Sequence, residues 1–76
     1  MREEKLKELL TKLISQNYSP VQAWNFSDAY VIEALKEGNK FSELFKIDKR
    51  TEELYDFNPT REQIKILQRN KSALLF

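Results

Sequence analysis

Three acidic residues in the second half of the chain are the first group whose chemistry can be judged from the sequence. Glu52, Glu53 and Asp56 cluster within one short segment. Two carboxylates held close together can act as a general acid and a general base. The same grouping is typical of the solvated face of a short helix, and that is the role we expect here.

The chain of 76 residues contains no cysteine and no histidine. It therefore has no thiolate nucleophile, no imidazole base, no disulfide and no ligands for a nitrogen- or sulfur-bound metal. It also has no glycine-rich phosphate loop and no dense carboxylate loop of the calcium type. We expect no catalytic, metal-binding or cofactor-binding residues and predict that the protein is not an enzyme by itself.

Lysine and arginine form two local groups that could contact phosphates. Residues 39–50 have a local charge of +2, four basic minus two acidic, and more basic residues follow on the polar side of the last expected helix. These later residues are Arg61, Lys65, Arg69 and Lys71. Acidic residues interrupt both groups, and the net charge of +1 gives no overall field for nucleic acid. Nucleic-acid binding is therefore the rival hypothesis.

Apolar side chains are the stronger indication of a partner. Residues 6–14 carry five aliphatic side chains on one helical stripe, and the chain ends in Ala-Leu-Leu-Phe. This is more apolar surface than one small bundle hides readily, and exposed apolar patches usually mark interaction sites. We expect self-association, or a groove formed by the first helix, the connector aromatics and the carboxyl-terminal turn. The predicted partner-binding residues are Leu6, Leu10, Leu13, Trp24, Tyr30, Leu75 and Phe76.

The element expected to position these residues is a central helix over about 28–37. Ser27 is a suitable N-cap, and Gly38 stands where a left-handed residue ends a helix. The residues between them are apolar around most of the helical circumference, which is typical of a helix packed on several sides. We expect Val31, Ile32 and Leu35 in the core.

Further helices are expected on both sides of this central one. Residues 1–17 contain an amphipathic first helix over Arg2 to Gln16, with leucines at helical spacing. Short helical segments are predicted after Ser19-Pro20, over 41–47 and after Asp48. A last helix begins at Asn58-Pro59 or at the competing capping box of Thr60 and Gln63, and Asn70 is its expected break.

No segment shows strand alternation between turn dipeptides, and the single glycine leaves little scope for hairpins. We therefore predict an all-α fold, a small bundle of about five short helices around the central apolar helix. Residues 1–76 are expected to form one helical domain, because the chain shows no repeat, no low-complexity tract and no second hydrophobic unit.

Residues 24–76 contain a series of motifs whose order can be compared with known families. The motifs are Trp24-Asn25-Phe26-Ser27, Glu-Ala-Leu-Lys-Glu-Gly, Phe-Ser-Glu-Leu-Phe-Lys-Ile-Asp, Leu54-Tyr55-Asp56-Phe57-Asn58-Pro59-Thr60 and Leu67-Gln68-Arg69-Asn70. Their order resembles the helical small subunit of extradiol ring-cleavage dioxygenases, a fold that is similar to the leader-type domain of split borosin peptide precursors. In both settings this unit is a non-catalytic partner of a larger protein, and the resemblance implies that role here.

The functional hypothesis is a non-catalytic helical protein–protein interaction module that acts with a larger protein. That role covers an enzyme accessory subunit and a leader-like recognition domain for a peptide-modifying enzyme. The alternatives are a small phage- or mobile-element-type inhibitor or regulator, and a weakly basic nucleic-acid-binding protein. We expect a cytoplasmic location and no membrane span, because the chain has no long apolar run and no signal-peptide pattern. We also expect no cofactor and no small-molecule substrate.

Overall fold

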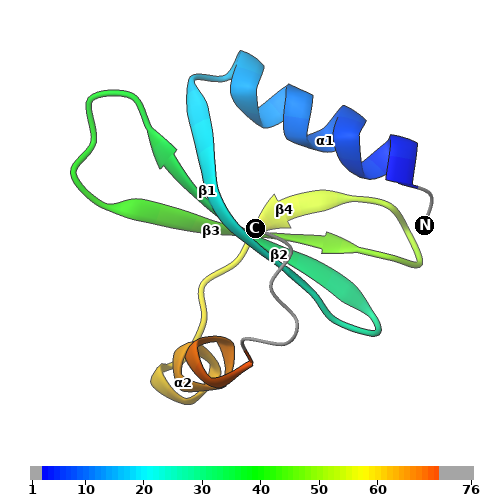
Figure 1. The fold of residues 1–76 in the computed structure, drawn as a ribbon, viewed down its shortest axis with the longest axis vertical. Coiled ribbons are helices and arrows are strands. Elements are labelled where there is room, and N and C mark those ends of the chain that lie inside the picture. The colour runs from blue at the N-terminus through cyan, green and yellow to red at the C-terminus, as the bar shows by residue number, and fades with distance from the viewer. Residues whose placement is uncertain (1–2, 71–76) are drawn as a thin grey trace.

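The computed structural model describes residues 3–70 and contains one antiparallel sheet with a helix on each face (Figure 1). The four strands lie side by side in sequence order, β1-β2-β3-β4. Helix α1 covers one face of the sheet and helix α2 lies against the other (Figure 1). The elements are α1 (Glu3–Ser15), β1 (Tyr18–Asn25), β2 (Ala29–Lys36), β3 (Ser42–Asp48), β4 (Leu54–Asp56) and α2 (Arg61–Arg69).

The prediction of an all-α bundle around a central helix over 28–37 is wrong. That segment forms strand β2, which pairs with β1 on one side and with β3 on the other. A central strand covered on both faces has an almost continuous apolar sequence, and this cannot be told from a buried helix by periodicity alone. The central position was predicted correctly, whereas the secondary structure was not.

The other segments predicted as short helices also belong to the sheet or its turns. The segment after Ser19-Pro20 is part of β1, with a register irregularity between Pro20 and Gln22, and residues 42–48 form β3. Asp48 caps a tight turn instead of a helix, because its carboxylate accepts hydrogen bonds from the backbone N–H groups of Arg50 at 2.7 Å and Thr51 at 3.3 Å. The helical fold that the family resemblance implies is therefore not the fold of residues 3–70.

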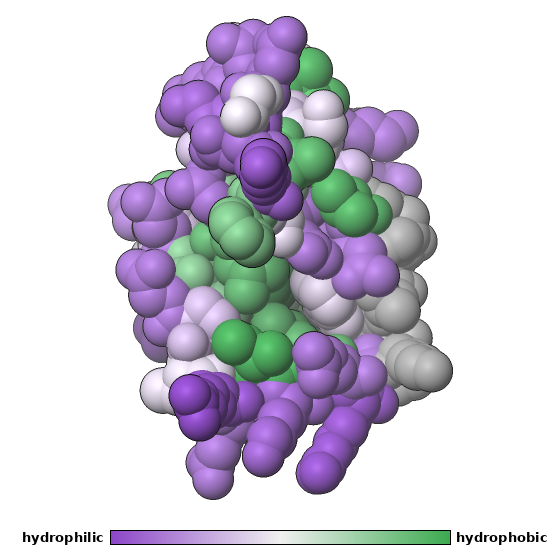
Figure 2. All heavy atoms as spheres, turned by 90° about the vertical axis from the view of Figure 1, so that its left-hand side faces the viewer, coloured by the Kyte–Doolittle hydropathy of each residue, from purple (hydrophilic) through white to green (hydrophobic). Residues whose placement is uncertain are grey.

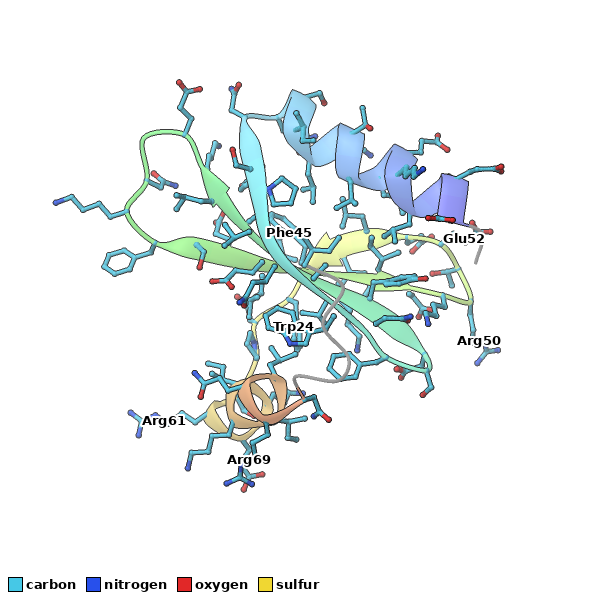
Figure 3. All side chains as sticks on the ribbon, viewed as in Figure 1. Trp24, Phe45, Arg50, Glu52, Arg61 and Arg69 are labelled. Carbon is cyan, nitrogen blue, oxygen red and sulfur yellow. The ribbon has the colours of Figure 1, made fainter. Side chains whose placement is uncertain are left out.

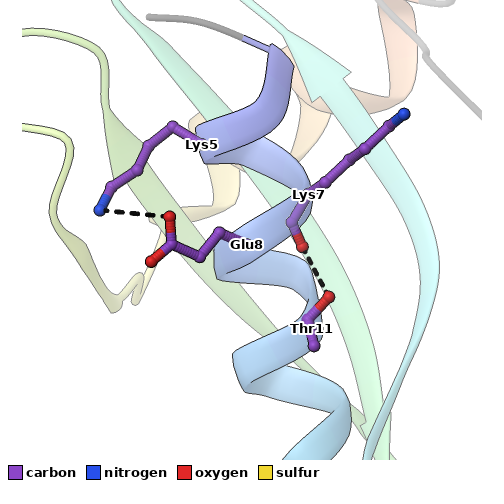
Figure 4. Close-up of polar contacts among 4 residues, drawn as sticks. All are labelled: Lys5, Lys7, Glu8 and Thr11. Carbon is purple, nitrogen blue, oxygen red and sulfur yellow. Dashed lines mark hydrogen bonds and ion pairs between the residues drawn. The ribbon is translucent and has the colours of Figure 1, made fainter.

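The two terminal helices were predicted correctly. Helix α2 begins at the capping box, in which Thr60 and Gln63 exchange backbone and side-chain hydrogen bonds, and it ends at Asn70. Along the outer side of α1, Lys5 lies 3.9 Å from Glu8 and the Thr11 hydroxyl donates to the Lys7 carbonyl at 2.8 Å (Figure 4). Helix α2 begins and ends as expected because its capping signals are local in sequence.

The two faces of the sheet hold two separate apolar clusters. Consecutive residues in a strand point to opposite faces, so Val31 packs toward α2 and Ile32 packs toward α1. Figure 3 shows the same division, with Phe45 on the α1 side and Trp24 on the α2 side. The larger cluster, under α1, consists of Leu9, Leu13, Ala23, Ile32, Ala34, Phe45 and Ile47.

The β2–β3 hairpin extends past α2 and ends in a turn at Gly38. This glycine has a φ of +87°, so the left-handed conformation was predicted correctly, although it turns a hairpin instead of ending a helix. Of the residues expected in the core, Val31 and Ile32 are buried, whereas Leu35 is 37% exposed near this turn. The hairpin end of the α2-side face is therefore less covered than its centre.

Candidate protein-interaction surface

The β3 strand is only partly covered by β4 at the edge of the sheet. β4 pairs with the stretch from Phe45 to Ile47, and the Phe57 N–H then donates one further bond to the Leu44 carbonyl at 2.9 Å. After Phe57 the chain leaves the sheet to form α2. The first two residues of β3, Ser42 and Glu43, therefore have no strand of the described chain beside them on this side.

A hollow of about 380 Å³ lies along this uncovered half of β3, and we call it the edge groove. β3 forms one wall, and the segment that connects β4 to α2 forms the other together with the first turns of α2. The groove is lined by Ser42, Glu43, Leu44, Asp56, Phe57, Asn58, Pro59 and Ile64. Its size is within the range of about 300–1,000 Å³ that is usual for binding pockets.

Apolar side chains gather next to the edge groove on the α2 side of the sheet. Leu35 and Leu44 share this face. Paired residues of neighbouring strands point to the same face, and Leu35 pairs with Ser42, which is two residues from Leu44, whereas Leu44 pairs with Glu33, which is two residues from Leu35. Phe41, in the loop directly before β3, is 83% exposed, and Ile64 of α2 is 39% exposed. We call Leu35, Leu44 and Ile64, together with Phe41 of the adjoining loop, the apolar band. Figure 2 shows apolar side chains crossing this side of the molecule between two hydrophilic regions.

The α1 side of the same edge is acidic. Glu43 and Asp56 are both exposed, and both lie close enough to Tyr18 to influence its ionisation. The pKa of Tyr18 lies above its ordinary value, mainly because its hydroxyl hydrogen-bonds to the Glu43 carboxylate, with further contributions from burial and from the charges of Glu43 and Asp56. Among residues 3–70, neither carboxylate forms an ion pair with a basic side chain.

The leucines predicted to bind a partner from the first helix face the sheet instead of forming an open stripe. Leu13 is 1% exposed, and Leu6 and Leu10 are half-buried against the same apolar cluster. Tyr30 is also half-buried there, and the Lys49 ammonium lies 4.6 Å from the centre of its ring. These four side chains do come together, on the α1 face of the sheet.

Trp24 lies on the opposite face from these residues. It is 6% exposed and packs with Val31 and Leu67 between the sheet and α2, and its indole N–H has no hydrogen-bond partner among the described residues. Leu75 and Phe76 lie outside the described residues. The structure therefore does not bring the predicted residues into one groove, and their contact with a partner stays a prediction.

The charged clusters also lie in positions that differ from those expected. Glu52 has a φ of +58° in the turn before β4, and Asp56 is in β4 itself, so the short helix expected to carry the acidic cluster is absent from this part of the chain. No three side chains of the metal-ligating acidic type are gathered at one point within residues 3–70. Arg61 and Arg69 extend from α2 away from the sheet, as Figure 3 shows.

The edge groove and the apolar band were missed because no strand was predicted. One signal was present, since Phe45 and Ile47 alternate with Lys46 and Asp48, which is a strand pattern. It spans only four residues, and Leu44 next to it also satisfies a helical spacing. Which half of β3 stays uncovered depends on the length of β4, and no local pattern reports that.

No family model, curated protein or solved structure matches this chain. The geometry of the surface is therefore the basis for the functional argument. Neither helix within residues 3–70 is long and apolar enough to cross a membrane.

Proposed function

We propose that this protein is a small non-catalytic interaction domain that binds a larger protein through the apolar band. The observation that carries the proposal is the exposure of Phe41, which is 83% exposed in the β2–β3 loop, directly before Ser42, the strand partner of the partly exposed Leu35. A phenylalanine contributes nothing to the core from that position. A partner that covers it would bury its ring and the neighbouring aliphatic side chains together.

The chemistry of the band supports a protein ligand. Apolar residues that gather on one face, with polar residues around them, are typical of interaction sites on soluble proteins. Aromatic side chains at the centre of such surfaces often supply much of the binding energy, with losses above about 2 kcal/mol on truncation. Phe41 is the expected anchor, and Leu35, Leu44 and Ile64 are the other apolar contacts that we expect the partner to make.

Site-specific photo-crosslinking tests this function. A photoreactive phenylalanine analogue at position 41 should form covalent adducts with one partner in cells of the native host, and mass spectrometry then identifies that partner. The matched control carries the same analogue at Thr51, which is exposed in the turn at the other end of β3. Equal labelling from both positions, or no adduct from position 41, would contradict the proposal.

A specific observation also favours polyanion binding by α2 as a second function. Arg61, Lys65 and Arg69 are four residues apart, so they lie within about 80° of the helical circumference with a rise of about 6 Å per step. The buried Leu67 is on the opposite side of the same helix. The three cations thus form a basic ridge that faces away from the sheet, and such a ridge can follow a phosphate backbone.

A salt series on a labelled DNA or RNA duplex tests the basic ridge. Phosphate contacts predict that the affinity falls steeply with salt, and that replacing Arg61, Lys65 and Arg69 with glutamine makes the dependence shallower by about three units of log–log slope. The control replaces Lys7, Lys12 and Lys36 with glutamine and should leave the slope unchanged. If the protein binds nucleic acid and the α2 variant has the same affinity and salt dependence as the parent, the basic ridge is not the contact.

A further inference from the structure

The backbone at the edge groove is free to form hydrogen bonds. The Leu44 carbonyl faces the β4 side of β3, since it accepts the Phe57 N–H there. The backbone of a strand repeats every two residues, so the N–H and C=O groups of Ser42 face the same side. No β4 residue pairs with Ser42. Among residues 3–70, the edge groove therefore offers a backbone donor and a backbone acceptor without a strand partner, beside an apolar hollow.

The side chains around this edge differ between the two faces of the sheet. On the α2 side the groove has the apolar surfaces of Leu44, Phe57 and Ile64. On the α1 side it has the exposed carboxylates of Glu43 and Asp56. A strand placed beside β3 projects its side chains alternately toward these two faces. Its successive residues would thus meet an apolar surface and an acidic surface in turn.

We propose that the edge groove binds an extended peptide segment of the partner, in which apolar and basic side chains alternate, by adding it as a strand beside the first half of β3. This inference rests on the proposed protein-interaction function and names the site and the chemistry of the bound segment. The added strand lies about 4.8 Å from β3. It continues the position of β4 in the sheet beyond Phe57, where the chain turns away. Its apolar side chains fill the groove beside Leu44 and Ile64, and its basic side chains pair with Glu43 and Asp56.

This mode of binding divides affinity and specificity between backbone and side chains. Strand addition to an open sheet edge supplies main-chain hydrogen bonds with little dependence on sequence. The apolar hollow selects a side chain at every second position, and the two carboxylates select positive charge at the positions between. A segment with the same composition in a different order would satisfy only one of the two faces.

Synthetic peptides provide the first test. The probe is an eight-residue peptide in which lysine alternates with valine, and the comparison peptide has four valines followed by four lysines. Isothermal titration with the full chain should show at least tenfold tighter binding of the alternating peptide. Amide exchange at Ser42 should slow at least tenfold on binding, because its N–H becomes bonded to the added strand.

Two pairs of variants separate backbone pairing from charge. Ser42→Pro removes the free N–H at an edge position where proline is tolerated, whereas Ser42→Ala removes only the hydroxyl that donates to Glu33. We expect at least tenfold weaker peptide binding for Ser42→Pro and an unchanged affinity for Ser42→Ala. The double variant Glu43→Lys/Asp56→Lys should prefer a glutamate–valine peptide, whereas the control Glu37→Lys/Glu53→Lys should keep the preference for lysine.

The outcomes distinguish this inference from the function on which it rests. Equal binding of the alternating and block peptides, or unchanged amide exchange at Ser42, would overturn strand addition. If neither peptide binds while position 41 still crosslinks to one partner, the partner uses the apolar band without the edge, and the inference is wrong although the proposed function holds. If position 41 also forms no adduct, both are wrong.

Discussion

Ile32 and Leu35 show how different two apolar residues of one strand can be. Ile32 is 0% exposed in the α1-side cluster, whereas Leu35 is 37% exposed near the hairpin turn. We predict that Ile32→Ala lowers the free energy of unfolding by about 2–5 kcal/mol, because it removes buried methyl groups and leaves a cavity. Urea unfolding followed by circular dichroism measures the change.

Leu35→Ala is the matched control for this comparison. It removes the same kind of side chain from the same strand, but at a position that folding covers only partly. We expect it to cost less than half as much as Ile32→Ala. Equal losses for the two variants would mean that the hairpin end of β2 is as buried as its centre, and that the apolar band is not an exposed surface.

Tyr18 provides a prediction about pH. Its pKa is raised above the ordinary value of 10.0, mainly through the hydrogen bond to the Glu43 carboxylate. The folded state therefore favours the neutral phenol, so the associated stability is present below about pH 10 and is lost as the pH rises through the folded-state pKa. Glu43→Gln should lower the pKa of Tyr18 toward 10.0.

The ionisation of this one tyrosine can be followed by NMR of its ring carbons. Glu53→Gln is the control, because it removes one exposed carboxylate that does not act on Tyr18. We expect this control to leave the titration of Tyr18 unchanged. A Tyr18 pKa that is the same in the parent protein and in Glu43→Gln would show that the Glu43 carboxylate does not act on the Tyr18 hydroxyl.

At the scale of the elements, the β2–β3 hairpin depends on the backbone of Gly38. Its φ of +87° is a conformation that residues with a Cβ rarely adopt, and a Cβ built there would meet nothing within 4 Å. Gly38→Ala should therefore destabilise the protein by about 1 kcal/mol through backbone strain alone, without any clash. Thermal or urea unfolding measures this cost.

A second substitution at the same position separates strain from volume. Gly38→Asn adds a larger side chain, but asparagine tolerates the left-handed conformation better than alanine does. We expect Gly38→Asn to be less destabilising than Gly38→Ala. The reverse order would show that the space around the turn matters, contrary to the open surroundings of Gly38.

Within residues 3–70, the molecule has two apolar layers that share only the sheet. Trp24 reports on the α2 layer, where it packs with Val31 and Leu67. Leu67→Ala should loosen this layer and shift the Trp24 fluorescence to longer wavelength. Tyr18 and Phe45 form an edge-to-face contact in the α1 layer, with ring centres 5.0 Å apart. The NMR shifts of these two rings should stay unchanged in Leu67→Ala.

Leu13→Ala is the reciprocal variant on the other face. It should change the ring shifts of Phe45 while the emission maximum of Trp24 stays in place, since Leu13 belongs to the α1-side cluster. Coupled changes in both layers from either variant would contradict the separation of the two clusters.

The features that depend only on neighbours in the chain can be predicted from the sequence alone. The bounds of the two terminal helices follow from local signals, such as the leucine spacing of α1 and the Thr60–Gln63 capping box of α2. The left-handed conformation of Gly38 follows from the properties of glycine. These signals act over a few residues, so no knowledge of the fold is needed to interpret them.

The secondary structure of the segments between the helices depends on contacts between distant parts of the chain. Residues 29–36 satisfy a buried helix and a buried strand equally well, and the choice depends on partners in β1 and β3 that are distant in the chain. The same holds for the candidate surface, since the edge groove exists only because β4 is shorter than β3. Strand pairing is a non-local interaction, so the hydrogen bonds that select it are formed between segments that no local pattern connects.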